Sequence, residues 1–463
     1  MRKKATIDFL RRRPKAALKN SFYDMTMSTP FLENYDDFAS GLPGSDVTWL
    51  EKLRRDGNAT YRSLGLPGPR VEAWKYTNLT RMGRTKFVPA LNIEKSSLDD
   101  VPNGALDIDA PKLVLVNGLL RPDLSDLNEL PNGICVESLA SIMASDPARL
   151  KGIMGQINAG HPMPMLALNT AYLSDGVMID IDAEVDADIP IHIVSVGTAS
   201  DVPIAFHPRN LVYAGANSRS TIYESHVGLG TAYLNNVATE VCIAEGGLLR
   251  HRKLQNETED SYHIAATAVS LDVRAQYENY TLNVGGRLAR NEIHVAFTGR
   301  EADCKLYGAY IGQGSQHIDT TTFVDHAVSG CTSREVYKGA LDDNARGVFQ
   351  GKILVRKDAQ KTDGHQLNKV LLLSEGSEID AKPELEIYAD DVKCSHGATA
   401  GELDEEQLFY LRARGLKETE AGDLLVAAFL EDSLEVIDDE APRDAFRNVI
   451  SNWLVMRRRQ GEG

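Results

Sequence analysis

The strongest constraint on the fold is a long succession of short β-type segments that begins after Asp175 and ends near Gly401. The segments are rich in Val, Ile, Thr and Tyr, and Gly, Asn, Asp and Ser separate each one from the next. Polar residues of modest size alternate densely with Val, Ile and Ala within them. The expected strands cover residues 189–196, 210–213, 220–224, 238–243, 265–275, 280–284, 292–297, 320–324, 347–355, 370–373 and 384–388.

Glycines mark expected corners between these segments at intervals of roughly 20–30 residues, a spacing typical of stacked, one-dimensional β architectures. A coil with two strands and two turns needs about that many residues. The pattern therefore favours a parallel β-helix or β-solenoid, with a β-sandwich as the alternative. The corner glycines are Gly228, Gly246–Gly247, Gly285–Gly286, Gly312, Gly314 and Gly339.

Helical patterns flank the β-rich part on both sides. We expect an N-terminal helical domain over 31–110, a β-helix core over 111–400 with some helix at 125–175, and a C-terminal helical domain over 401–463. Asp404 is placed to cap the first C-terminal helix together with Gln407, and Gly415 is placed to end it. Residues 401–440 contain 13 acidic and 3 basic residues, which indicates either a solvated face or a docking surface for a basic partner.

The first 26 residues have a different composition, because eight Lys and Arg residues accompany only Asp8 and Asp24. Such a segment fits a transit peptide, a disordered arm, or an upstream start codon with Met25 or Met27 as the true beginning. We expect residues 1–30 to be a disordered basic extension.

Composition and missing motifs exclude several functions. The net charge of -16 argues against a general nucleic-acid or membrane-surface binder, and the longest apolar run, near Leu424–Leu430, is too short to cross a bilayer. The chain has no Gly-x-x-x-x-Gly-Lys-Ser/Thr, so we expect no ATP bound by this chain, and no His-Glu-x-x-His, Gly-x-Ser-x-Gly or complete dinucleotide fingerprint. A conventional hydrolase or dehydrogenase is therefore poorly supported, while the abundant acidic residues leave a carboxylate pair for glycoside chemistry open.

Five cysteines are scattered without any Cys-x-x-Cys, which predicts free thiols and a cytoplasmic protein. Cys135, Cys242, Cys304 and Cys331 are interpreted as small buried apolar residues. Cys394 differs, because it forms the one Cys-x-His pair of the chain with His396. In an extended strand Cys394 and His396 lie on one face, where a thiolate and an imidazole suit a soft or borderline metal. Two ligands do not complete a tetrahedral site, so the pair is either structural or half of a site shared with another chain.

Several longer stretches resemble the SufB/SufD family of iron–sulfur cluster assembly proteins. The resemblance covers most of the chain from about residue 31, and the Lys-Cys-Ser-His-Gly-Ala-Thr run is similar to the SufD branch. The matching stretches are residues 65–67, 72–77, 333–339, 347–353, 359–363, 390–399 and 408–415.

The resemblance implies a right-handed parallel β-helix between helical domains, and a non-ATPase subunit of the Suf iron–sulfur assembly scaffold. It implies pairing with a SufB paralogue through the β-helix core and binding of the SufC ABC-type ATPase through the C-terminal helices. Whether the isolated chain forms a homodimer stays open. His396 then ligates iron or a transient iron–sulfur cluster at the SufB–SufD interface, with Cys394 nearby. The residues expected to bind the ATPase are Asp404, Phe409, Leu411, Leu424, Leu425 and Phe429.

Two other functions stay open from the residues alone. A β-helix could belong to a carbohydrate-active lyase or hydrolase, or to a homo-oligomeric structural protein without a metal role. Cleavage of glycans would distinguish the first, and failure to reconstitute with iron and sulfide would distinguish the second.

Overall fold

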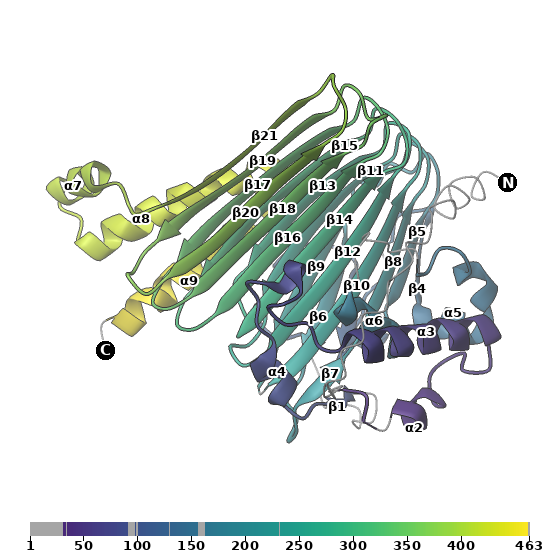
Figure 1. Ribbon diagram of the computed structural model, residues 1–463. Coiled ribbons are helices and arrows are strands. Elements are labelled where there is room, and N and C mark those ends of the chain that lie inside the picture. Colours follow the sequence, from purple (N-terminus) through teal and green to yellow (C-terminus); the bar gives the residue numbers. More distant parts are fainter. Residues whose placement is uncertain are drawn as a thin grey trace.

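The computed structural model describes residues 31–33, 35–90, 98, 101–128, 130–155, 163–230 and 232–461. The expected basic extension 1–30 lies outside the described residues. The fold is mainly β, as predicted, and is a parallel β-helix of about 8 turns (Figure 1). The β-sandwich alternative is wrong, because neighbouring strands in the stack run parallel and each pairs with the strand of the next coil.

Two long sheets form the walls of the stack. The first sheet has 11 strands and the second has 10. The first sheet contains β1 (Val88–Pro89), β4 (Ile134–Ser138), β5 (Val177–Ile181), β7 (Ile204–Phe206), β8 (Arg209–Ala214), β10 (Tyr233–Ile243), β12 (Tyr262–Leu271), β14 (Leu288–Phe297), β16 (His317–His326), β18 (Arg346–Val355) and β20 (Glu378–Ile387). The second contains β2 (Lys112–Val116), β3 (Leu119–Leu120), β6 (Ile191–Gly197), β9 (Arg219–Gly228), β11 (Leu248–Asn256), β13 (Gln276–Asn283), β15 (Asp303–Gly312), β17 (Thr332–Leu341), β19 (Asp363–Leu372) and β21 (Lys393–Gly401).

Helices precede and interrupt the first coils, and a second group follows β21, the last strand of the stack. The α-helices are α2 (Tyr35–Ala39), α3 (Thr48–Leu64), α4 (Thr80–Arg84), α5 (Leu139–Ser145), α6 (Pro164–Ala171), α7 (Glu405–Ala413), α8 (Glu418–Glu431) and α9 (Glu440–Gly461). Short 3₁₀ helices are η1 (Glu72–Trp74), η3 (Pro147–Leu150) and η4 (Asp432–Val436). Helix therefore occurs inside 125–175, as expected, while the domain limits at 110 and 400 stay predictions. Among the described residues, no helix is both long and apolar enough to cross a membrane.

A column of left-handed turn residues marks one edge of the stack. The backbone N–H of Asn217 donates to Glu245 at 2.9 Å, that of Gly246 to Val273 at 2.9 Å, and that of Arg274 to Arg300 at 2.9 Å. Glycine adopts this conformation most easily, and the non-glycine residues here are held in it by the repeated bond to the next coil. The column consists of Glu184, Asn217, Gly246, Arg274, Glu301, Gly330 and Lys361, all with positive φ.

One expected corner is wrong. Gly339 lies inside β17 rather than at a turn, in register with Tyr310 of β15. Two residues earlier the glycine and the tyrosine exchange strands: Gly308 of β15 lies in register with Tyr337 of β17. A Cβ atom on Gly339 would overlap the ring of Tyr310, and one on Gly308 would lie 2.7 Å from the ring of Tyr337. Both glycines therefore make room for a buried tyrosine of the adjacent coil.

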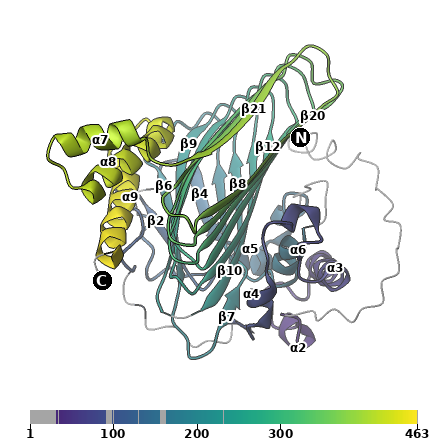
Figure 2. The same cartoon turned by 60° about the vertical axis from the view of Figure 1, so that its left-hand side comes forward.

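The two groups of helices cover opposite outer faces of the stack (Figure 2). Leu79 and Leu168 of the N-terminal region pack with Ile264 and Leu288 on the first sheet. On the second sheet, the C-terminal helices α8, η4 and α9 form a cluster with one or more residues from each of β9, β11, β13, β15 and β17. The members of this cluster from the helices include Val426, Leu430, Leu434, Phe446, Ile450 and Trp453.

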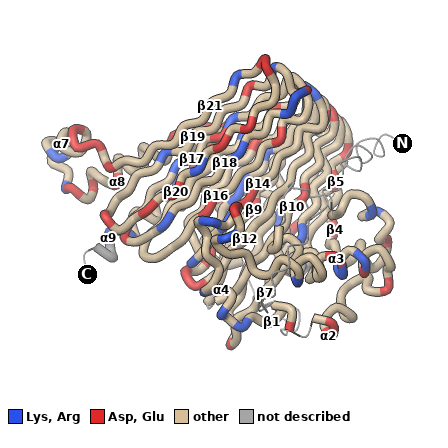
Figure 3. Tube along the Cα trace, in the orientation of Figure 1, with Lys and Arg blue, Asp and Glu red and all other residues tan. Residues whose placement is uncertain are grey.

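Asp404 caps α7 as predicted, accepting a hydrogen bond from the Gln407 backbone N–H at 2.9 Å. Gly415, with φ of 96°, follows the end of α7 and supplies the left-handed residue expected there. Acidic residues outnumber basic ones over residues 401–440, which contain α7 and α8 (Figure 3).

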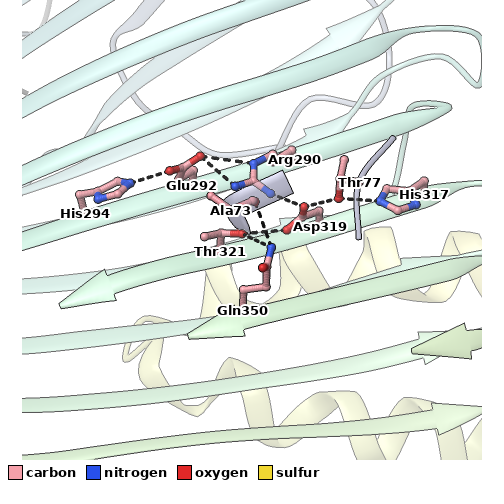
Figure 4. A network of polar contacts seen from close by, with 9 residues as sticks. All are labelled: Ala73, Thr77, Arg290, Glu292, His294, His317, Asp319, Thr321 and Gln350. Carbon is pink, nitrogen blue, oxygen red and sulfur yellow. Dashed lines mark hydrogen bonds and ion pairs between the residues drawn. The ribbon is translucent and has the colours of Figure 1, made fainter. Parts of the chain in front are cut away.

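The 72–77 stretch contacts the first sheet through a buried polar network (Figure 4). The Arg290 guanidinium lies 4.1 Å from the centre of the Trp74 ring and pairs with Asp319 and Glu292. The Thr77 hydroxyl donates to Asp319. These contacts fix the N-terminal region on β14 and β16, with the Trp74 ring buried against the first sheet.

We predict that Gly339→Ala lowers the free energy of unfolding by about 1–3 kcal/mol, because the added methyl group forces the Tyr310 ring out of its position. The measurement is the midpoint of urea unfolding. Gly68→Ala is the matched control, since a Cβ atom there meets nothing within 4 Å. Equal midpoints for the two variants would show that the tyrosine and glycine do not fit together as described.

Candidate functional site

The Cys394 and His396 pair lies on β21, the last strand of the second sheet. Cys394 is half-buried and packs against the interior core, whereas His396 is exposed. Both face inward, because the residues in register with them on β19, Gly364 and Gln366, are buried between the sheets. The sequence interpretation of a shared face for Cys394 and His396 therefore agrees with the strand register.

His396 is exposed although it points inward, because the stack ends at this coil. β20 and β21 are the last strands of their sheets, so no described strand covers their outer edges. His396 lies in register with Gln366, which lies in register with Glu335. Within the described part of the chain, the His396 imidazole makes no hydrogen bond or ion pair and is available to a ligand.

Cys394 is a less available ligand than His396. Burial and the nearby Asp363 carboxylate raise the pKa of the Cys394 thiol, while the Gly364 backbone lowers it to a smaller extent. A raised pKa keeps the sulfur protonated near neutral pH, where the thiol is a weaker nucleophile and metal ligand than the thiolate. A Cβ atom on Gly364 would lie 3.6 Å from the Cys394 Sγ, so the glycine leaves space beneath the sulfur.

Gln366 ties the two sheets together directly beneath His396. Its Nε2 donates to the Glu384 backbone carbonyl of β20 at 3.0 Å. Gly351 on β18 makes room for the Gln366 carboxamide, because a Cβ atom there would overlap Oε1. The glycine in the 347–353 stretch therefore positions the residue that supports the terminal coil.

A second histidine, His365 on the adjacent strand β19, already has partners. His365 lies half-buried on the outward face of β19, with Nδ1 2.6 Å from the Ser395 Oγ and Nε2 2.7 Å from the Asp363 Oδ1. These partners orient its ring toward the neighbouring side chains. Of His365 and His396, the latter is the one left free for a ligand.

Two exposed apolar residues near the same end were not identified in the sequence analysis. Ile387, the last residue of β20, is 41% exposed, and Tyr388, which follows it, is 60% exposed. An apolar residue at a strand edge has no sequence signal of its own, because its exposure depends on where the stack ends. Together with the free edges of β20 and β21, they give this end a surface suited to association.

The six residues predicted to bind a partner fall into two groups. Asp404, Phe409 and Leu424 are exposed, and Phe409 is 74% exposed on α7, a helix without buried residues. Leu411, Leu425 and Phe429 are half-buried. The Phe429 ring lies 4.7 Å from the Lys338 Nζ and packs toward the second sheet.

All five cysteines are free thiols, as expected. Cys304 and Cys331 are buried, which confirms the interpretation of those two, and Cys242 is partly buried. Cys135 is exposed, so the prediction of a buried residue there is wrong. Its strand β4 lies at the end of the first sheet, paired only with β5, and the side chain points away from the interior core.

Glu335 is a fully buried carboxyl group in the coil beneath Gln366, and burial raises its pKa from the usual 4.5 to about 7. Because the folded chain holds this proton up to pH 7 and the unfolded chain releases it near pH 4.5, the stability contribution is largest below pH 4.5 and falls as the pH rises toward 7.

We predict that the stability of the wild type falls by up to about 3 kcal/mol relative to Glu335→Gln between pH 5 and pH 8. Urea unfolding at both pH values measures the difference. Glu386→Gln is the control, because Lys352 holds the pKa of that half-buried carboxyl below its usual value and the sign of the pH dependence is opposite. A pH-independent difference between wild type and Glu335→Gln would contradict the assignment.

Comparison with known proteins agrees with this architecture. The SufBD core domain of the SUF iron–sulfur cluster assembly system matches residues 195–429, and the SufBD N-terminal region matches residues 25–193. An iron–sulfur cluster assembly SufBD family protein of Synechocystis is 33% identical, over 88% of this chain and 92% of its own. The SufD protein of Escherichia coli is 30% identical, over 81% of this chain and 86% of its own.

The matched core domain contains the coils from β9 to β21 together with α7 and most of α8, and the two matches together span the described helices before them. The resemblance seen in the sequence motifs is thus confirmed over nearly the whole length. The chain belongs to the SufBD family of iron–sulfur cluster assembly proteins and is SufD-like within it.

Proposed function

We propose that the chain is a non-enzymatic scaffold subunit in iron–sulfur cluster assembly, which pairs with a SufB paralogue through the terminal coil and contributes His396 to a cluster site between the two chains. The observation that carries the proposal is the exposed His396 imidazole, which has no partner among the described residues, on the inward face of a β-helix end that no described strand covers.

The free strand edges support pairing at this end. β20 and β21 present backbone N–H and C=O groups that another strand can satisfy, and exposed strand edges are usually covered in native proteins. A paralogue with the same fold offers edges of matching spacing. The same geometry allows an isolated chain to pair with a second copy of itself.

The ligand chemistry supports a shared site. His396 and Cys394 supply an imidazole and a thiol, both suited to iron and to iron–sulfur clusters. Two ligands leave the coordination incomplete, so the partner supplies the remainder. The cluster is the cargo of this reaction, and the role of this chain is to hold iron in position at the interface while the cluster forms.

We predict that His396→Ala lowers cluster formation by the purified complex roughly tenfold or more, because a direct ligand is lost where even outer-shell changes cost 10–100-fold. Cluster formation is followed by visible absorption after anaerobic addition of iron and sulfide. Cys394→Ser is expected to have a smaller effect, since the thiol is partly buried and its pKa is raised.

His365→Ala is the matched control, because it removes a histidine from the neighbouring strand whose ring already has partners. Size-exclusion chromatography confirms that each complex stays intact. Wild-type cluster formation by an intact His396→Ala complex would refute the role of His396.

The C-terminal helices support a second interface, for an ABC-type ATPase. The chain lacks a phosphate-binding loop, so ATP hydrolysis has to come from a partner. Phe409 and Tyr410 of α7 are 74% and 57% exposed, and Leu424 of α8 is 51% exposed. Exposed aromatic residues beside an acidic segment form a surface for a partner with an apolar pocket and a basic rim.

We predict that Phe409→Ala combined with Leu424→Ala reduces co-purification of the ATPase at least tenfold, because two exposed apolar anchors are removed. These substitutions test the surface more specifically than deletion of the helices. Deletion would also remove Phe446 and Trp453 of α9, which are part of a core cluster on the second sheet. Val455→Ala, on an exposed position of α9, is the control. Undiminished binding by the double variant would refute this interface.

The setting that we propose is the cytoplasm. Five free thiols and an iron–sulfur cargo both fit a reducing compartment.

A further inference from the structure

A group of ionisable side chains lies buried at the corner where strands of the second sheet pass into strands of the first. His226 lies near the end of β9, Glu257 directly follows β11, and His263 lies near the start of β12. Their potential ligand atoms all lie within 4.8 Å of one another. These residues belong to early coils of the β-helix and are separate from His396 on the last coil.

The register of the coils brings these residues together. His226 pairs with Gln255, so Glu257 lies two residues further on the same side as Gln255. His263 pairs with Asn235 of β10. The Glu257 backbone carbonyl accepts a hydrogen bond from the Gly286 N–H at 3.0 Å, which fixes the residue at the corner.

His263 is the observation that points to a ligand. Its side chain is fully buried, and neither ring nitrogen has a hydrogen-bond partner among the residues that the structure describes. The His263 Nδ1 lies 2.7 Å from the Glu257 Oε2, but the two atoms are not aligned for a hydrogen bond. A buried imidazole is rarely left without partners, and nitrogen and carboxylate atoms that converge without hydrogen bonding are expected around a cation.

The surrounding polar groups hold these side chains as an outer shell would. The His226 Nε2 lies 2.7 Å from the Glu224 Oε1, which leaves Nδ1 on the side of the group. The Gln255 Nε2 donates to the Glu257 Oε2 at 3.1 Å. The Asn235 Nδ2 lies 3.1 Å from both the His226 Nδ1 and the Glu257 Oε1, while its Oδ1 has no partner in the described part of the chain. Rotation of this amide would turn Oδ1 toward the same point as a further oxygen ligand.

The charges also favour a cation. Two carboxylates, Glu224 and Glu257, are buried here, and the buried Lys253 lies in register with Glu224. One buried ammonium balances one buried carboxylate, and the second still needs positive charge in a medium of low polarity. A divalent ion supplies that charge and gives the His263 nitrogens a ligand contact in addition to Glu257.

We propose that His226, Glu257 and His263 form a binding site for a first-row divalent metal ion inside the β-helix. Two imidazoles and one carboxylate suit Zn²⁺ or Fe²⁺, and thiolates are absent from the group. The ion is resident, because the ligands are buried, and it enters while the chain folds. Its role is to hold the corner between coils, separately from the cargo iron at the terminal coil.

The test is the metal content of the full chain, purified without chelators from cells supplied with zinc, iron or cobalt, by mass spectrometry of the metals. We expect the wild type to retain a stoichiometric ion, and Glu257→Gln and His263→Gln to retain roughly tenfold less or lower. His326→Gln is the matched control, because His326 is a buried histidine whose Nε2 already lies 2.8 Å from the Ser333 Oγ. His396→Ala should also keep the ion.

If a variant does not fold, a second measurement on the wild type locates the ion directly. Crystals of the cobalt-substituted wild type should show an anomalous peak between His226, Glu257 and His263. A wild-type chain without metal, an ion that both Gln variants retain, or a peak located elsewhere would each overturn the proposal. Loss of the ion in His396→Ala alone would assign it to the terminal coil instead.

Discussion

In-register parallel pairing between coils is the constraint on which the rest of the structure depends. Each residue of a strand lies beside its counterpart in the next coil, so side chains of equivalent position form continuous rows through the interior. One large residue in a row requires a small one beside it, as Tyr310 does with Gly339. Polar residues also form a row, from Glu335 through Gln366 to His396.

The same constraint explains what could be predicted from the sequence. Strands with mostly apolar inward residues, such as β14 and β18, were identified. β11, β15 and β17 were missed. In β11 and β17, inward residues such as His251, Lys253 and Glu335 are polar and hide the alternation. Periodicity reports burial only where the buried residues are apolar.

The candidate sites divide in a similar way. The shared face of Cys394 and His396 follows from their spacing in one strand and was predictable. The exposure of His396 was not, because it depends on the stack ending at β21. His226 comes from β9, Glu257 follows β11 and His263 comes from β12, and their proximity depends on a register that the sequence does not reveal. Both sites therefore follow from how the coils stack rather than from a local motif.

The C-terminal helices have a mechanical consequence for the stack. In an open solenoid each coil contacts only its neighbours, and stability is a sum of local terms. Here one helical segment packs across Tyr223 of β9, Tyr280 of β13 and Ala340 of β17, and Arg457 of α9 pairs with Asp342 just beyond β17. Distant coils are thereby held together through the same helices, so the displacement of any one coil disturbs the helix contacts of the others. The β-helix should respond to force or denaturant as a single elastic unit rather than by peeling one coil at a time.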